Sequence, residues 1–103
     1  MHVRIGPINY ELQLVPDLNE NGKTTGAIRY RDCIIVLDAD LSPQARVQTL
    51  WHEVLHGIMG HLNIKDDEAM IDRLSYAVME LLQDNLWLAT WNGSTIHGDN
   101  NTS

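Results

Sequence analysis

The feature of this sequence that most constrains its fold is a change in the spacing of apolar residues at residue 42. Before it, apolar and polar side chains alternate, as in the segment from Ile8 to Leu14, and this is the period of a half-buried β-strand. After it, apolar residues recur every three or four positions, which is the period of an amphipathic helix. Ser42-Pro43 stands at the change, and a hydroxyl residue followed by proline is a typical helix start. The chain therefore predicts strands first and helices afterwards.

Three strands are predicted before this change, at residues 8–14, 27–30 and 33–37. The last of them is apolar at every position, so we expect it to be covered on both faces. The short strand beside it, within Gly26–Tyr30, is then expected at the edge of the sheet. An exposed edge strand can pair with an extended peptide through its backbone.

Two helices are predicted after the change. The first is expected to run from Pro43 to a stop at Gly60, and the second to begin near Asp66, whose side chain suits a helix cap. Strands followed by helices predict an α+β fold, with a small antiparallel or mixed three- to four-stranded sheet packed on two main helices. The residues expected to face the core from the second helix are Met70, Ile71, Leu74, Ala77, Val78, Leu81 and Leu82.

The length and charge of the chain limit its organisation and its partners. The 103 residues correspond to one domain, expected over residues 1–91, and the polar residues 92–103 are expected to form a disordered tail. With 14 acidic against 7 basic residues, the formal net charge is −7. This balance argues against binding to nucleic acid or to an anionic membrane surface, because both need clustered Lys and Arg.

The only cysteine, Cys33, excludes an internal disulfide and a zinc site built from cysteines. The amino-terminal residues lack the charged and apolar regions of a secretory signal. Elsewhere, no stretch of the sequence approaches the roughly 20 apolar residues of a membrane span. We therefore expect a cytoplasmic protein.

The motif His52-Glu53-Val54-Leu55-His56 lies within the first predicted helix. Residues four apart are neighbours on a helix surface, so both imidazoles can point at one metal ion. Glu53 lies about 60° beyond His56, on the side away from the apolar stripe, where it can reach a metal-bound water without ligating the metal. A hydrolytic zinc site requires nitrogen ligands, an open position for water and a carboxylate to take the water's proton. The sequence therefore predicts one bound Zn²⁺ ion, with Glu53 as the catalytic base.

A catalytic zinc ion normally has three protein ligands, so a third is needed. Glu68 is preferred, because packing of the second helix against the first could bring its carboxylate to the metal. Asp72, one turn further along, and Asp67 are the alternatives on the same helix. His61 also follows the histidine pair, but on a continuous helix it would point about 140° away from His56.

These motifs resemble those of small phage- and prophage-encoded proteins related to the ImmA/IrrE-type zinc metallopeptidases. The resemblance runs from Gly26 to Asn85, and Thr49, Leu50, His52, Glu53 and His56 match the family's helix motif. Glu68 matches the position of the family's third zinc ligand. The resemblance implies a minimal zincin-like fold, a zinc-bound water activated by Glu53, and a location in the cytoplasm of a bacterial host. Relatives in this family include peptidases that inactivate DNA-binding repressors of mobile elements.

Two functions of different classes follow from the sequence. The first is a zinc-dependent metallopeptidase that cleaves a peptide bond in a protein or peptide substrate. The alternative is a zinc-stabilised binding module that sequesters a host or phage protein without turnover. Glu53 favours the enzyme, because a structural zinc ion needs no general base and usually has four protein ligands. The sequence leaves the substrate, the oxyanion-stabilising group and the oligomeric state open.

Overall fold

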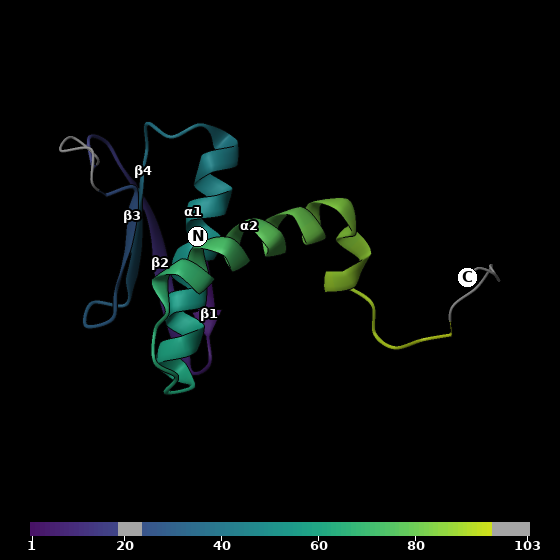
Figure 1. Ribbon diagram of the computed structural model, residues 1–103. Coiled ribbons are helices and arrows are strands. Elements are labelled where there is room, and N and C mark those ends of the chain that lie inside the picture. Colours follow the sequence, from purple (N-terminus) through teal and green to yellow (C-terminus); the bar gives the residue numbers. More distant parts are fainter. Residues whose placement is uncertain (19–23, 96–103) are drawn as a thin grey trace.

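The computed structural model describes residues 1–18 and 24–95, which form a four-stranded sheet, two long helices and a short 3-10 helix (Figure 1). The elements in chain order are β1 (His2–Ile5), β2 (Ile8–Val15), β3 (Gly26–Arg29), β4 (Ile34–Asp38), α1 (Pro43–His61), α2 (Glu68–Asp84) and η1 (Leu86–Ala89). The predicted α+β class is confirmed. Within the described residues, no helix combines the length and the apolar character needed to cross a membrane. The tail predicted at residues 92–103 lies outside the described residues from residue 96 onward.

The sheet consists of two hairpins that lie side by side. β1 pairs antiparallel with β2, and β3 pairs antiparallel with β4. The hairpins join along β2 and β4, which pair in parallel, so the strand order is β1-β2-β4-β3. The sheet is therefore mixed, and β1 is a fourth strand that the alternation from Ile8 onward did not indicate. In the described part of the chain β3 is paired on one side only, which confirms Gly26–Tyr30 as the site of an edge strand.

The hydrophobic core lies between α1 and one face of the sheet. Its buried cluster comprises Ile5, Tyr10, Ile35, Leu37 and Val54. Ile35 and Leu37 lie on β4, which has a strand on each side, and their exposed fractions are 0% and 2%. Val36, between them on the opposite face, is also only 2% exposed. The prediction that this apolar strand is covered on both faces is therefore confirmed for residues 35–37.

Two glycines allow α1 to lie close to β3. A Cβ atom added to Gly57 would lie 2.6 Å from Cδ1 of Ile5 and 3.0 Å from Cδ1 of Ile28. On the strand, a Cβ atom added to Gly26 would lie 2.6 Å from Cγ2 of Thr49. The two distances of 2.6 Å are too short for a real Cβ atom, so a side chain at either position would require its neighbour to move. The edge strand is thus held against the part of α1 that carries the histidine motif.

The start of α1 is as predicted, but its end is not. Ser42 is the N-cap, its hydroxyl accepts a hydrogen bond from the Ala45 backbone N–H at 3.2 Å, and Pro43 is the first helical residue. The predicted stop at Gly60 is wrong, because the helix continues to His61. Asn63, with φ of +61°, adopts the left-handed conformation that commonly follows a helix end.

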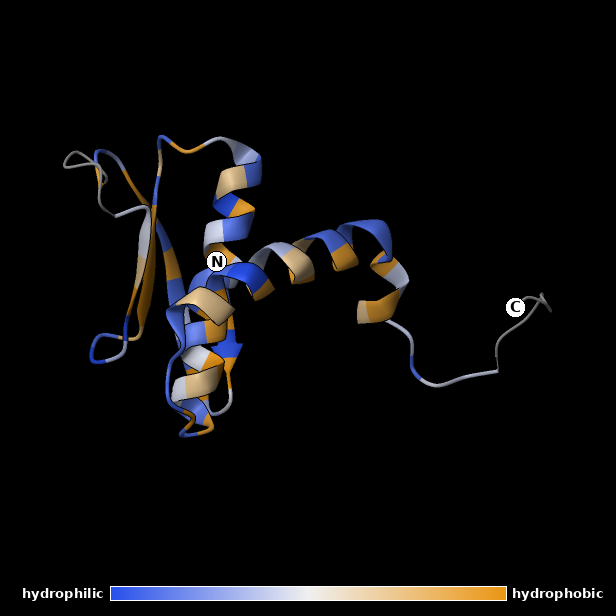
Figure 2. Ribbon diagram, viewed as in Figure 1, coloured by the Kyte–Doolittle hydropathy of each residue, from blue (hydrophilic) through white to orange (hydrophobic). Residues whose placement is uncertain are grey.

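α2 packs against α1 and, in the described residues, makes no contact with the sheet (Figure 1). Its buried residues are Ile71, Ser75 and Met79, which lie four positions apart and form a single narrow row. The wider stripe predicted to face the core is only partly correct, because four of its members are exposed. These are Met70, Leu74, Ala77 and Leu81. One neighbouring helix covers only one side of α2, and bands of hydrophobic residues remain along the part that projects from the domain (Figure 2).

Candidate metal centre

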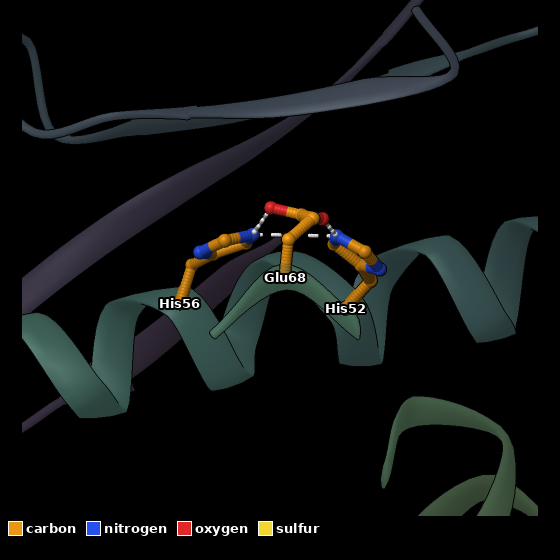
Figure 3. Close-up of side chains that lie close together, drawn as sticks. All are labelled: His52, His56 and Glu68. Carbon is orange, nitrogen blue, oxygen red and sulfur yellow. Dashed lines mark hydrogen bonds and ion pairs between the residues drawn. The ribbon is translucent and has the colours of Figure 1, made fainter. Parts of the chain in front are cut away.

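Three side chains from the two helices converge at the point where α2 begins to cross α1 (Figure 3). Nε2 of His52 lies 2.6 Å from Oε1 of Glu68, and Nε2 of His56 lies 3.1 Å from Oε2 of the same carboxylate. The two Nε2 atoms lie 3.3 Å apart. Figure 3 shows the carboxylate of Glu68 above the two imidazoles, with all three groups facing one point. The structure therefore brings together the three residues predicted as zinc ligands.

The spacing of these atoms fits a tetrahedral zinc site. With Zn–N bonds of about 2.0–2.1 Å, two nitrogen ligands at a tetrahedral angle lie about 3.3 Å apart. The observed separation of the two Nε2 atoms is also 3.3 Å. The Glu68 carboxylate lies closer to each imidazole than the two Nε2 atoms lie to each other, because it is at hydrogen-bonding distance from both. A small outward shift of Glu68 would therefore make room for the ion. Two imidazoles and one carboxylate are also a usual donor set for zinc.

Each histidine has a second carboxylate on its other ring nitrogen. Nδ1 of His56 lies 3.0 Å from Oδ2 of Asp66, and Nδ1 of His52 lies 3.4 Å from Oδ1 of Asp72. The contact of Asp66 is a hydrogen bond, and a carboxylate that accepts a hydrogen bond from Nδ1 leaves on Nε2 the lone pair that a metal requires. Asp72 lies beside His52 at ion-pair distance and outside the converging group, whereas the sequence had suggested it as an alternative ligand.

Glu53 lies beside the cluster, on the side of α1 away from the apolar stripe, as the helix pattern predicts. Nothing in the sequence indicates that this side is covered, and the exposed fraction of Glu53 is only 7%. β3 packs against α1 there, and a backbone hydrogen bond links Ile28 to the Glu53 carboxylate. Burial raises the pKa of this carboxyl group above its ordinary value, while His52, His56 and the Ile28 hydrogen bond oppose the rise. Glu53 is outside the set of converging ligand atoms.

A cavity of about 510 Å³ lies between the edge strand and the two helices, and the cluster forms part of its wall. Residues 24–28 line one side of it, and the histidine motif lines another. Tyr30 also contributes, and its hydroxyl donates a hydrogen bond to the His56 carbonyl oxygen at 3.1 Å. Burial and then the charge of Asp66 raise the pKa of Tyr30, so its hydroxyl remains a donor at neutral pH.

The two remaining alternative ligands have other positions. Asp67 is the N-cap of α2, and its carboxylate accepts a hydrogen bond from the Met70 backbone N–H at 3.1 Å. The sequence had given this capping role to Asp66, one residue earlier. His61 lies on the far side of Tyr30, where its imidazole packs against Gly6 in the turn between β1 and β2. Neither residue belongs to the converging group.

Two contributors to the site were not found from the sequence: Asp66 as the partner of His56, and the Ile28 backbone. Tyr30 and Tyr76 were possible hydroxyl donors from the sequence, which could place neither of them. For Asp66 a signal was present, because two histidine ligands need acceptors for their Nδ1 protons and the helix α2 begins with a run of acidic residues. The positions of Tyr30 and Ile28 depend on how β3 packs on α1, which no local pattern encodes.

Neither a family model, nor a curated protein, nor a solved structure matches this chain. The resemblance to the ImmA/IrrE-type peptidases is therefore carried by the motif residues alone.

Proposed function

We propose that this protein is a zinc-dependent peptidase that hydrolyses a peptide bond in an extended segment of another protein. One observation carries the proposal: His52, His56 and Glu68 converge beside a buried Glu53, in the wall of a cavity that follows the free edge of β3. A structural zinc ion usually has four protein ligands. The described residues offer three in this group, together with an adjacent carboxylate that is not one of them.

The chemistry divides between the metal and the chain. Zinc held by these residues would act as a Lewis acid, polarising a carbonyl group and making a water molecule more acidic. Glu53 then accepts the proton of the water that attacks the scissile carbonyl, and later delivers it to the leaving amine. The Ile28 backbone beside the carboxylate favours its charged form, in which it can accept a proton. Asp66 holds the His56 imidazole by a hydrogen bond to Nδ1, so that its Nε2 would face the metal, and Asp72 places a second negative charge beside His52.

The free edge of β3 supports an extended polypeptide as the substrate. A peptide that added to this edge would form backbone hydrogen bonds that do not depend on its sequence. The contact of Gly26 with Thr49 fixes the edge beside α1, so an added strand would run along the cavity that His52 and Glu53 line. A small domain can hold its substrate in this way without a separate binding lobe.

The direct test uses Glu53→Gln, a change that keeps the size and most hydrogen bonds of the side chain but removes the base. Wild-type and variant proteins are loaded with zinc and incubated with a mixture of unfolded polypeptides, and new amino termini are counted by mass spectrometry. We expect the variant to retain zinc and to lose cleavage by at least about 100-fold, as is typical for loss of a general base. His61→Ala serves as the control and should cleave like the wild type, since His61 lies outside the site.

Two results would contradict the proposal. Equal cleavage by wild type and Glu53→Gln would remove Glu53 from the mechanism. A wild-type protein that binds zinc and captures polypeptides without cutting any of them would instead favour the zinc-stabilised binding module.

A further inference from the structure

The side of α2 that faces away from α1 carries an exposed apolar stripe, defined by Met70, Leu74, Ala77 and Leu81. The exposed fractions of Met70, Leu74 and Leu81 are 43%, 40% and 52%, and Ala77 between them is also exposed. At 100° per residue, the centre of the stripe lies about 130° around the helix from the row packed on α1. The described residues therefore leave the stripe uncovered, and a contiguous apolar surface on a soluble domain marks a site of contact.

The spacing within the stripe identifies the kind of partner. Its members are separated by four, three and four positions, which is the alternation that packs two helices along a shared seam. We propose that a second copy of this chain covers the stripe, through antiparallel pairing of the two α2 helices about a twofold axis. In that register Leu74 lies opposite the partner's Ala77, and Met70 lies opposite the partner's Leu81. Large residues then face small or flexible ones, so the stripe complements itself.

Charges beside the stripe favour the antiparallel direction. Arg73 and Glu80 flank it on the same side, both are exposed, and neither forms an ion pair within residues 1–18 and 24–95. In an antiparallel pair, this flank of one helix meets the same flank of the other, so Arg73 lies near the partner's Glu80. The twofold axis repeats the pair, giving two complementary contacts. In a parallel pair, this flank would instead meet the opposite flank of the partner, with Arg73 near the partner's Val78, which would leave the charge without a partner.

The two ends of α2 extend the same surface. The stripe alone covers roughly 18 Å by 10 Å, which is small beside the ~800 Å² per partner of a standard interface. Exposed apolar residues lie just before α2, at Leu62 and Ile64, and just after it, at Leu86 and Trp87. Antiparallel pairing brings the first end of one helix to the second end of the other, so these residues can add to the interface.

The pairing leaves the candidate metal centre open. Glu68 lies on the α1 side of α2, about 150° around the helix from the centre of the stripe. A dimer would therefore carry two accessible sites, and zinc content and association can be measured independently.

Sedimentation equilibrium of the zinc-loaded full chain, over a range of concentrations, tests the proposal. The wild type should show a reversible monomer–dimer equilibrium. Leu74→Glu should abolish the dimer, because it places a charge in the seam, while zinc content and helical circular dichroism stay unchanged. Gln83→Glu is the matched control, since Gln83 is exposed on the other side of α2, and it should dimerise like the wild type.

A charge exchange tests the direction of pairing without touching the apolar residues. Arg73→Glu should raise the dissociation constant about tenfold, because two attractive pairs become repulsive. Adding Glu80→Arg to the same chain restores opposite charges and should return the constant to the wild-type value. Failure of this rescue would overturn the antiparallel arrangement. If the wild type stays monomeric at every soluble concentration, the proposed dimer is wrong and the stripe would have to be covered by a different protein.

Discussion

The two helices of this protein differ in how they are held, although both contribute to one site. α1 is covered on one side by the sheet and on another by α2, and Val54 at its centre is part of the main core. Among the described residues, α2 has α1 as its one large neighbour, and its buried residues are Ile71, Ser75 and Met79. One polar link adds to this contact, since the Gln48 amide donates to the Ser75 hydroxyl at 2.7 Å.

This difference separates the roles of the three proposed ligands. His52 and His56 are fixed by the fold of α1, whereas Glu68 reaches them only while α2 is docked. A metal ion bound by all three would join the two helices. We therefore expect the histidines to set whether zinc binds, and the docking of α2 to set how tightly.

The largest expected effect is on zinc binding itself. A His52→Ala/His56→Ala double variant should lose zinc altogether, because only one proposed ligand remains. Glu68→Ala should keep weakened binding through the two α1 ligands, and His61→Ala should bind normally. Competition with a chromophoric chelator measures all three affinities. If zinc remains in the double variant, or if His61→Ala weakens binding more than Glu68→Ala, the ligand assignment is wrong.

A matched pair of core truncations compares the two regions directly. Ile35 on β4 and Ile71 on α2 are both 0% exposed, so Ile35→Ala and Ile71→Ala remove the same atoms from equally buried places. Ile35→Ala should lower the free energy of unfolding by about 2–5 kcal/mol. Ile71→Ala should cost less global stability, because α2 can separate from α1 while the sheet and α1 remain folded.

Zinc affinity should rank these two variants in the opposite order. Ile71→Ala loosens the helix that carries Glu68, whereas Ile35→Ala leaves the site intact in every folded molecule. Urea unfolding with a chelator present, followed by zinc titration in buffer, gives both rankings. Equal losses in both measurements would mean that the two helices unfold as one unit.

The smallest expected effect concerns the carboxylates behind the histidines. Asp66→Ala should weaken zinc binding by about 10–100-fold, the usual range for a residue that orients a ligand. Asp72→Ala should weaken it less, because Asp72 lies 3.4 Å from Nδ1 of His52 whereas Asp66 lies 3.0 Å from Nδ1 of His56. The same chelator competition measures both. If Asp72→Ala lost more zinc affinity than Asp66→Ala, the contact of Asp72 with His52 would be the more important of the two.

The sequence predicted best the features that depend on residues close together in the chain. The start of α1 at Ser42-Pro43 and the strand predicted at 33–37 depend on local spacing, and the structure confirms the helix start and has the strand at Ile34–Asp38. The spacing of His52 and His56 is also local, and the structure places their ring nitrogens side by side. Glu68 also joins this group, although it comes from the next helix.

The errors arose where one element has to be placed against another. The burial of Glu53 was not anticipated, because nothing in the helix pattern indicates that β3 covers that side of α1. The apolar positions of α2 were all assigned to the core, because helical periodicity finds apolar residues without showing how many neighbours cover them. Leu74 and Leu81 match the pattern as well as Ile71 does, yet only Ile71 is buried.

The parallel pairing of β2 with β4 also has a consequence for the kinetics of folding. Each hairpin closes over a short stretch of chain, and hairpins of this kind form in about 1–10 μs. Joining them requires contacts such as that of Leu12 with Ile35. These residues are far apart in sequence, so the loop-closure entropy lost when they meet is larger. We therefore expect the rate-limiting barrier to lie at the meeting of the two hairpins. Substitutions along β2 and β4 should then slow folding, whereas substitutions in α2 should mainly speed unfolding.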